Sequence, residues 1–291
     1  MQINCRGGGT PTYGCTMNTT LRTLQLKARH QVYTLLSGHN LSKLHGEGYD
    51  FSELREYQIG DDIRKINWTI TAKLGKPYIK ELHANRELSV VVAAFMDGSL
   101  YYGTSNTKQV KLTEVATLLA YATQQNADMF TGIRYEAHKT TSTVPTKQIY
   151  HIEQFSKGLF EASLLGTKVN SVSSVENLFK RVHKPSLLFV LSDFLEEIDL
   201  SLLAQKHEVV AIIVRDREEE SPKKLGEVTL INPQFNAKLD TYFGKRSIEK
   251  YLAKLEENDQ KLKEHFARYD IRSVKIFTDD EVVSKLVSLF V

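Results

Sequence analysis

Cysteine is nearly absent from this sequence of 291 residues, and its only two cysteines, Cys5 and Cys15, lie close to its beginning. A disulfide framework is therefore excluded for the rest of the chain, as is usual for proteins of the reducing cytosol. Long apolar runs are absent too: the longest, Val90–Met96 and Val209–Val214, have the length of a strand, whereas a membrane-spanning helix needs roughly 20 such residues. We expect a cytoplasmic protein without a membrane span, in which residues 1–18 form a disordered leader.

An excess of one charge is also missing. The 38 lysine and arginine residues face 35 aspartate and glutamate residues, which leaves a formal net charge of +3. A dedicated nucleic-acid-binding protein usually concentrates its basic side chains on one face or in one run, and the sequence contains no such run. Hydrophobic residues make up 41% of the chain, which allows a substantial buried core. The composition predicts a globular protein whose partners are not nucleic acids.

The common catalytic motifs are absent as well. The sequence contains no GxxxxGK[ST] phosphate-binding loop, no HExxH zinc motif and no GxSxG nucleophile elbow. His83 and His207 stand beside apolar runs without a partner motif, which favours a structural role for both. Because no residue is specified as a nucleophile, we expect a protein that is not an enzyme.

From residue 88 onward, apolar runs of strand length alternate with amphipathic stretches of helical spacing. Such alternation predicts an α/β fold in which a mainly parallel sheet is flanked by helices. The segments expected in chain order are a helix at 20–36, a strand at 88–96, a helix at 107–126, a strand at 130–137, helices at 149–160 and 172–182, a strand at 187–191, a helix at 198–206, a strand at 209–214, a hairpin of 228–231 with 237–241, a helix at 247–269, a strand at 274–277 and a helix at 281–290.

Two of the buried strands end in polar residues. Asp97 and Ser99 follow the first strand, and Asp193 follows the strand at 187–191. Ligands of open α/β sheets bind at the carboxyl ends of the strands, and carboxylate and hydroxyl oxygens suit a hard divalent ion such as Mg²⁺ or Mn²⁺. These residues are therefore candidate metal ligands, unless they only cap the loops and helices that follow.

A dense group of charged residues lies in residues 46–82, which we call the charged segment. Two interpretations stay open for this group: an ion-pair network that holds an irregular segment together, or a docking surface for another protein. Asp61 and Asp62 are also placed to cap a short helix over residues 63–66, and Trp68 is expected to pack the segment onto the sheet. The candidate interaction residues are Arg55, Glu56, Asp61, Asp62, Arg64 and Trp68.

The charged segment carries a long motif, GEGYDFSELREYQIGDDIRKINW at residues 46–68, which is followed by AKLGKPYIKEL and by the strand ending in MDGS. Together with SLLFVLSDF at 186–194 and HEVVAIIVRDREE at 207–219, this pattern closely resembles the domain-of-unknown-function 58 family. The resemblance implies a von Willebrand factor A-like, Rossmann-type domain over residues 87–291. It also implies a family-specific N-terminal elaboration over residues 19–86.

The resemblance further implies a role in binding. Members of this family are associated with MoxR-type AAA+ ATPases, so the chain is expected to be a chaperone-like adaptor that acts with such an ATPase on a client protein. A von Willebrand-type metal site has the pattern D-x-S-x-S, and here Asp97 and Ser99 match while Tyr101 replaces the second serine. The site is thus a degenerate metal-ion-dependent adhesion site, with its threonine position near Asn170 or Thr167. The alternative function is a divalent-metal-dependent hydrolase of phosphorylated substrates.

Overall fold

A computed structural model describes residues 21–31, 53–58, 61, 63, 66, 68–81, 88–137, 139–235 and 237–289. These residues fall into two compact units. The larger unit contains the N-terminal helix and everything from Leu88 onward, and the smaller unit comes from Leu41–Glu87. Each unit is described by itself below.

The larger unit is built on a six-stranded sheet with the strand order β10-β7-β6-β3-β4-β5. All neighbouring strands are parallel except β4 and β5, which pair antiparallel at one edge. The sequence prediction of a mainly parallel sheet in an α/β fold is therefore confirmed. The strands are β3 (Ser89–Phe95), β4 (Met129–Tyr135), β5 (Thr140–Ser142), β6 (Leu187–Ser192), β7 (Glu208–Arg215) and β10 (Arg272–Phe277).

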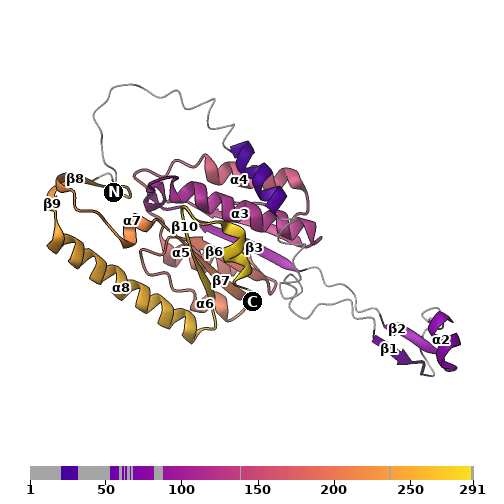
Figure 1. Cartoon of the computed structure of the whole chain (residues 1–291). Coiled ribbons are helices and arrows are strands. Elements are labelled where there is room, and N and C mark those ends of the chain that lie inside the picture. The colour runs from indigo at the N-terminus through magenta and orange to yellow at the C-terminus, as the bar shows by residue number, and fades with distance from the viewer. Residues whose placement is uncertain are drawn as a thin grey trace. The chain divides into compact units, whose positions relative to one another are not determined.

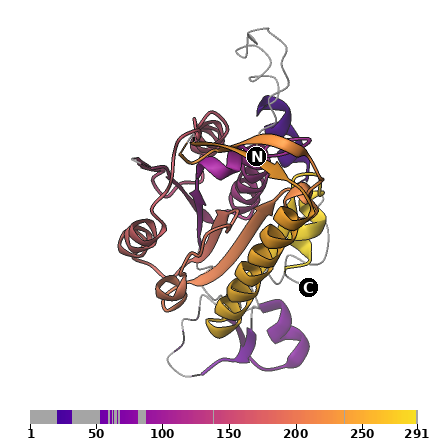
Figure 2. The ribbon, with the colours of Figure 1, turned by 90° about the vertical axis from the view of Figure 1, so that its left-hand side faces the viewer.

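Helices cover both faces of this sheet (Figures 1 and 2). On one face lie α3 and α4, and on the other lie α5, α6 and the long α8, while α9 follows β10 at the end of the chain. Residues 21–31 are also helical and lie against α3 through an ion pair of 2.6 Å between Lys27 and Glu114, and against α4 through one of 3.6 Å between Arg29 and Glu153. The helices are α3 (Lys108–Gln125), α4 (Ile149–Phe160), α5 (Ser171–Arg181), α6 (Ser201–Ala204), α8 (Lys245–Arg268) and α9 (Val282–Val287).

The central strands are buried on both sides, as their continuous apolar sequences predict. Every residue of β6 is buried, and so are all residues of β3 after Ser89. Because side chains alternate along a strand, Val91, Ala93 and Phe95 form one cluster with residues of α5 and α8. The opposite face of the sheet packs against α3, whose Leu112, Val115 and Leu118 are fully buried.

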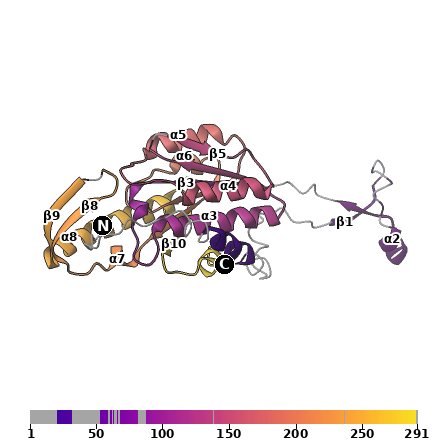
Figure 3. The ribbon, with the colours of Figure 1, turned by 90° about the horizontal axis from the view of Figure 1, so that it is seen from above.

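A two-stranded hairpin of β8 (Gly226–Asn232) and β9 (Ala237–Phe243) lies at one end of the larger unit, next to α7 (Arg217–Glu220) and α8 (Figure 3). The sequence predicts this hairpin correctly. It misses α7, the edge strand β5 and a 3₁₀ turn, η3 (Gly98–Tyr101). These elements have three or four residues each, too few for a hydrophobic period to be visible.

The smaller unit contains an antiparallel pair of β1 (Glu53–Glu56) and β2 (Tyr78–Glu81), and the helix α2 (Trp68–Leu74). A helical turn does follow the acidic pair, as expected: Ile63 is in a 3₁₀ conformation, and the Ile66 amide donates a hydrogen bond of 3.2 Å to the Ile63 backbone oxygen. The Asp61 carboxylate accepts a hydrogen bond of 2.8 Å from the backbone amide of Gln58, so it stabilises the turn that precedes. The capping role expected of Asp62 lies outside the described residues.

Candidate functional site

The two polar strand ends meet at the carboxyl edge of the sheet. β3 and β6 are direct neighbours, with Ala94 paired to Leu191, so the residues that follow them lie side by side. The Ser99 hydroxyl helps to lower the pKa of Asp193, and the negative charge of Asp193 helps to raise the pKa of Asp97. The structure therefore brings together Asp97, Ser99 and Asp193, the three candidate metal ligands.

A buried lysine completes this group. Lys108, the first residue of α3, is fully buried, and its Nζ lies 2.8 Å from Asp193 Oδ2 and 2.6 Å from Glu219 Oε1. This lysine is not among the residues expected at the site, although its position in the helical pattern of the sequence points to it. Lys108 precedes the buried Leu112 by four residues, so it lies on the apolar stripe of the helix, where a charged side chain requires a buried partner.

Asp193 is held ionised by its neighbours. Burial by itself raises the pKa of Asp193, but Lys108, the Ser99 hydroxyl and Arg215 together lower it below its usual value. The fully buried Arg215 also donates from Nε to the Asp193 backbone oxygen at 2.5 Å and from Nη2 to the Phe194 backbone oxygen at 3.1 Å. Both the side chain and the backbone at this strand end are thus fixed by cationic groups.

Asp97 has the opposite environment. Burial is the main reason why its pKa is raised, and the negative charge of Asp193 adds to the effect, while the Gln234 side chain and the amides of Val169 and Ser99 oppose it. Its Oδ2 accepts a long hydrogen bond of 3.3 Å from the Val169 amide, and its buried Oδ1 has no hydrogen-bond partner. A half-buried carboxylate with one unsatisfied oxygen destabilises the fold.

The tip of the β8–β9 hairpin lies directly over this edge. The Pro233 backbone oxygen accepts a hydrogen bond of 2.8 Å from the Gly166 amide. It also approaches Gly98 so closely that a Cβ built there would lie 2.5 Å from it. The glycine of the Asp97-Gly98-Ser99 turn is therefore required by the close approach of another backbone. Three segments that are distant in sequence, residues 97–102, 164–172 and 233–235, form one surface, which we call the carboxyl-edge surface.

We expect Asp97→Asn to raise the free energy of unfolding at pH 7 by about 1 kcal/mol, because a neutral amide is easier to bury beside Asp193 than a second carboxylate. The pKa of Asp97 is raised on folding, so the folded state binds its proton more tightly. The contribution of Asp97 to wild-type stability should then rise as the pH falls toward the unfolded pKa of about 3.9. Asparagine does not titrate, so the gain in stability of Asp97→Asn over the wild type should shrink as the pH falls, which urea unfolding of both proteins at a series of pH values would show.

Asp199→Asn is the control for this prediction. The pKa of Asp199 is lowered, mainly by its hydrogen bond with Ser201, so its replacement should give no gain in stability at pH 7. A lower stability of Asp97→Asn than of the wild type at pH 7 would show that the ionised Asp97 carboxylate stabilises the fold, contrary to this prediction.

The strand-end group does not fit a divalent metal ion. Three of the four carboxylate oxygens of Asp97 and Asp193 already accept hydrogen bonds, from Val169, Lys108 and Leu195, which leaves only Asp97 Oδ1 without a partner. Within the described residues, no group of three or more His, Cys, Asp or Glu side chains is arranged to hold a metal. The two candidates for the threonine position also have other partners: the Thr167 hydroxyl donates to the Leu164 backbone oxygen at 2.6 Å, and Asn170 caps α5.

The candidate interaction residues are found in two places. Tyr101 lies at the carboxyl-edge surface and is 37% exposed. In the smaller unit Glu56 pairs with Lys76 at 2.9 Å, and Trp68 is 67% exposed; its expected packing onto the sheet of the larger unit stays a prediction. A seven-residue helix beside a two-stranded sheet offers little apolar surface to cover an indole. Asp62, Arg64 and the side chain of Arg55 lie outside the described residues.

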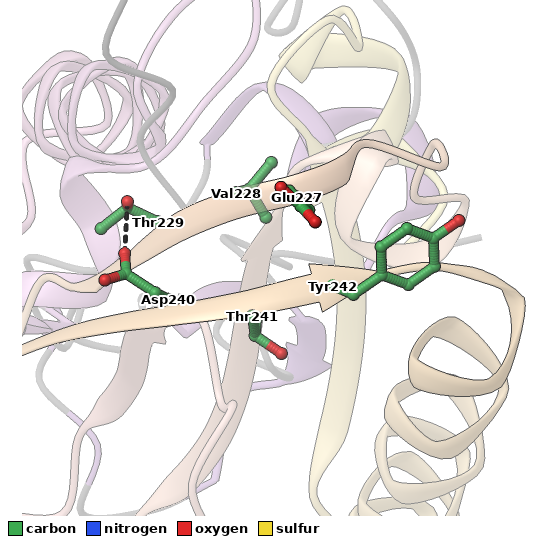
Figure 4. Close-up of a pocket in the computed structure, with 6 residues that line it drawn as sticks. All are labelled: Glu227, Val228, Thr229, Asp240, Thr241 and Tyr242. Atoms are coloured by element: carbon green, nitrogen blue, oxygen red, sulfur yellow. Dashed lines mark hydrogen bonds between the residues drawn. The ribbon is translucent and has the colours of Figure 1, made fainter.

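A separate shallow groove crosses the hairpin (Figure 4). There the Thr229 hydroxyl donates to Asp240 at 2.6 Å across the two strands. No strand-end residue lines this groove, so it adds nothing to the carboxyl-edge surface. Its lining residues are Glu227, Val228, Thr229, Asp240, Thr241 and Tyr242.

Comparison with known proteins identifies a family. The family model described as "Protein of unknown function DUF58" matches residues 53–261. Uncharacterized proteins of Mycobacterium bovis and Mycobacterium tuberculosis are 26% identical to this chain over 217 residues, which cover 72% of the chain and 68% of each relative. These relatives add no activity, substrate or partner to what the site shows.

Solved structures give weaker similarities. The conserved hypothetical protein BatB from Bacteroides thetaiotaomicron is 12% identical with a TM-score of 0.42, and covers 69% of this chain and 96% of its own. An aerotolerance-related membrane protein from Bacteroides fragilis is 9% identical with a TM-score of 0.41, and covers 70% and 96%. The second of these proteins is described as a membrane protein, and this description contradicts the expected cytoplasmic location of the chain. In the part of the chain that the structure describes, no helix is long and apolar enough to cross a membrane.

Proposed function

Since this chain belongs to the DUF58 family of proteins of unknown function, we propose that it is a non-catalytic adaptor that binds other proteins through a von Willebrand factor A-like domain. Its partners in this proposal are a MoxR-type AAA+ ATPase and a client protein that the ATPase assembles or matures. The resemblance of the motif at residues 46–68 to this family supports the choice of partner. In this proposal the partner binds at the carboxyl-edge surface.

One observation carries the proposal: large apolar side chains are exposed on all three segments of the carboxyl-edge surface. Tyr101 is 37% exposed on the first segment, Leu165 and Val172 are 48% and 68% exposed on the second, and Phe235 is 62% exposed on the hairpin tip. The backbone contacts of Pro233 with Gly98 and Gly166 hold these segments together. Apolar side chains that gather on one face and are bordered by polar groups are typical of protein-binding sites.

Asp97 gives independent support to the same surface. Its carboxylate accepts a bond from Val169, in the second segment of this surface, and has one buried oxygen without a partner, which is unfavourable for folding. Residues that reduce stability without a structural benefit are often retained for function. The exposed Trp68 of the smaller unit is a candidate second contact, because tryptophan is enriched at the centres of protein interfaces.

The proposal is tested by measuring binding of the purified chain to the purified MoxR-type ATPase of the same organism, by calorimetry or biolayer interferometry. Phe235→Asp and Leu165→Asp should each weaken binding by about tenfold or more, because each puts a charge into an apolar contact. Val144→Asp is the matched control, since Val144 is 64% exposed but follows β5, away from the carboxyl edge. If the wild type does not bind, the ATPase is not the partner. If all variants bind equally, the carboxyl-edge surface is not the binding site.

A further inference from the structure

The cation at the strand-end site is part of the protein chain. Lys108 Nζ lies between two carboxylates, at 2.8 Å from Asp193 and 2.6 Å from Glu219. Its side chain is completely buried, and those of Asp193 and Glu219 are 6% and 9% exposed. A buried ammonium with two short contacts to carboxylates is a charge-assisted arrangement of the strong kind.

The oxygens around Lys108 are already in use. The second oxygen of Glu219 accepts a hydrogen bond of 2.9 Å from the Asp216 amide, and the second oxygen of Asp193 accepts one of 3.4 Å from the Leu195 amide. A divalent ion takes about six oxygen ligands, and Mg²⁺ needs a nearly octahedral set at about 2.1 Å. To bind here, the ion would have to displace the Lys108 ammonium and leave it buried among other groups.

We infer that Lys108 takes the place of a divalent cation at this site, so that the carboxyl edge is held together without metal. The ammonium balances the carboxylates of Asp193 and Glu219, which is the structural role that a metal ion would otherwise perform there. It offers no exchangeable coordination position, and because it is buried it cannot reach a partner. If the proposed adaptor function is correct, partner binding at this edge does not depend on Mg²⁺ or Mn²⁺ and does not use a metal-bound carboxylate of the partner.

The first arm of the test uses the wild-type chain alone, so it does not depend on whether the proposed partner is correct. Binding of Mn²⁺ is followed by loss of the free-ion signal in electron paramagnetic resonance, and thermal unfolding is followed with Mg²⁺ or with EDTA. We expect no stoichiometric Mn²⁺ binding and no change of the unfolding midpoint, because a ligand that does not bind the folded state does not stabilise it. Stoichiometric binding that Asp193→Asn abolishes would overturn the inference.

The second arm removes the lysine. Lys108→Ala leaves Asp193 and Glu219 without their cation and vacates the space of the lysine side chain, so its unfolding midpoint should fall and should be raised again by Mn²⁺. Lys111→Ala is the matched control, because Lys111 is also on α3 and is 7% exposed, but it bonds to Glu114 at 2.8 Å and to the Asp280 backbone oxygen at 2.9 Å instead of to Asp193 or Glu219. Its midpoint should not respond to Mn²⁺. A folded Lys108→Ala protein that neither binds Mn²⁺ nor is stabilised by it would overturn the inference, and if this variant does not fold the wild-type arm decides.

Discussion

Replacing Arg215 by methionine is expected to lower the free energy of unfolding by about 3–5 kcal/mol, the usual effect of removing one partner from a buried ion pair. Arg215 is fully buried at the end of β7. It donates to the backbone oxygens of Asp193 and Phe194 and to the Asp259 carboxylate at 3.1 Å. Methionine has a similar length but no donor, so three acceptors lose a bond at once.

The backbone at Phe194 explains why these bonds matter. Phe194 has a φ of 47°, in the left-handed region that is unfavourable for a residue with a side chain. Its backbone oxygen accepts bonds from Arg215 and, at 3.0 Å, from Asn258, and its ring packs edge-on against Phe266 with centroids 5.8 Å apart. Arg215 therefore stabilises an unfavourable turn that places Asp193 beneath the carboxyl-edge surface.

Chemical denaturation of Arg215→Met beside Arg217→Met is the measurement. Arg217 is two residues away and pairs with Asp279 at 2.7 Å, but its side chain is 56% exposed. Exposed ion pairs contribute about 0–1 kcal/mol, so Arg217→Met should have a small effect. Equal losses in the two variants would mean that the buried contacts of Arg215 do not hold the strand end.

Much of the fold was predictable because apolar patterns report burial directly. The runs at 88–96, 187–191 and 209–214 became β3, β6 and β7, and the neighbouring positions of β3 and β6 brought Asp97 and Asp193 together as expected. A strand buried on both faces leaves a long uninterrupted signal, and polar residues at its end are visible as a break in that signal.

The identity of the cation at this site could not be predicted in the same way. Lys108 is 85 residues from Asp193 and 111 residues from Glu219 in sequence, and local periodicity does not report such pairings. The hairpin was predicted, but the position of its tip over Gly98 depends on tertiary contacts of Pro233. The candidate ligands were therefore identified, whereas the groups that occupy their oxygens were not.

Asp216→Ala is expected to destabilise the chain by about 3 kcal/mol, because Asp216 connects three segments at the same edge. Its carboxylate accepts bonds from the Thr104 amide at 3.0 Å, from the Thr278 hydroxyl at 2.7 Å and from the Glu218 amide at 3.0 Å. Alanine leaves these donors without their acceptor and removes the cap of α7. A lost cap is worth about 1 kcal/mol, and unsatisfied buried donors add about 1–3 kcal/mol.

The pH dependence of this loss distinguishes a lost charge from lost packing. Burial by itself raises the pKa of Asp216, but the bonds from Thr104, Thr278 and Glu218 lower it overall. A carboxylate whose pKa is lowered on folding stabilises the protein above its unfolded pKa of about 3.9, and this contribution disappears as the pH falls through the folded pKa. The difference between wild type and Asp216→Ala should therefore be constant from neutral pH to about pH 5 and should shrink below about pH 4.

Urea unfolding at a series of pH values checks both the size and the shape of this effect. Asp240→Ala is the control, because Asp240 is exposed on the hairpin and makes one hydrogen bond, with Thr229. Its loss should be within about 0.5 kcal/mol, as for most surface substitutions. If the loss of unfolding free energy in Asp216→Ala stays the same at low pH, the protonated Asp216 side chain stabilises the fold as much as the ionised one. The network of ionised groups at the carboxyl edge would then stabilise the fold less than its hydrogen bonds indicate.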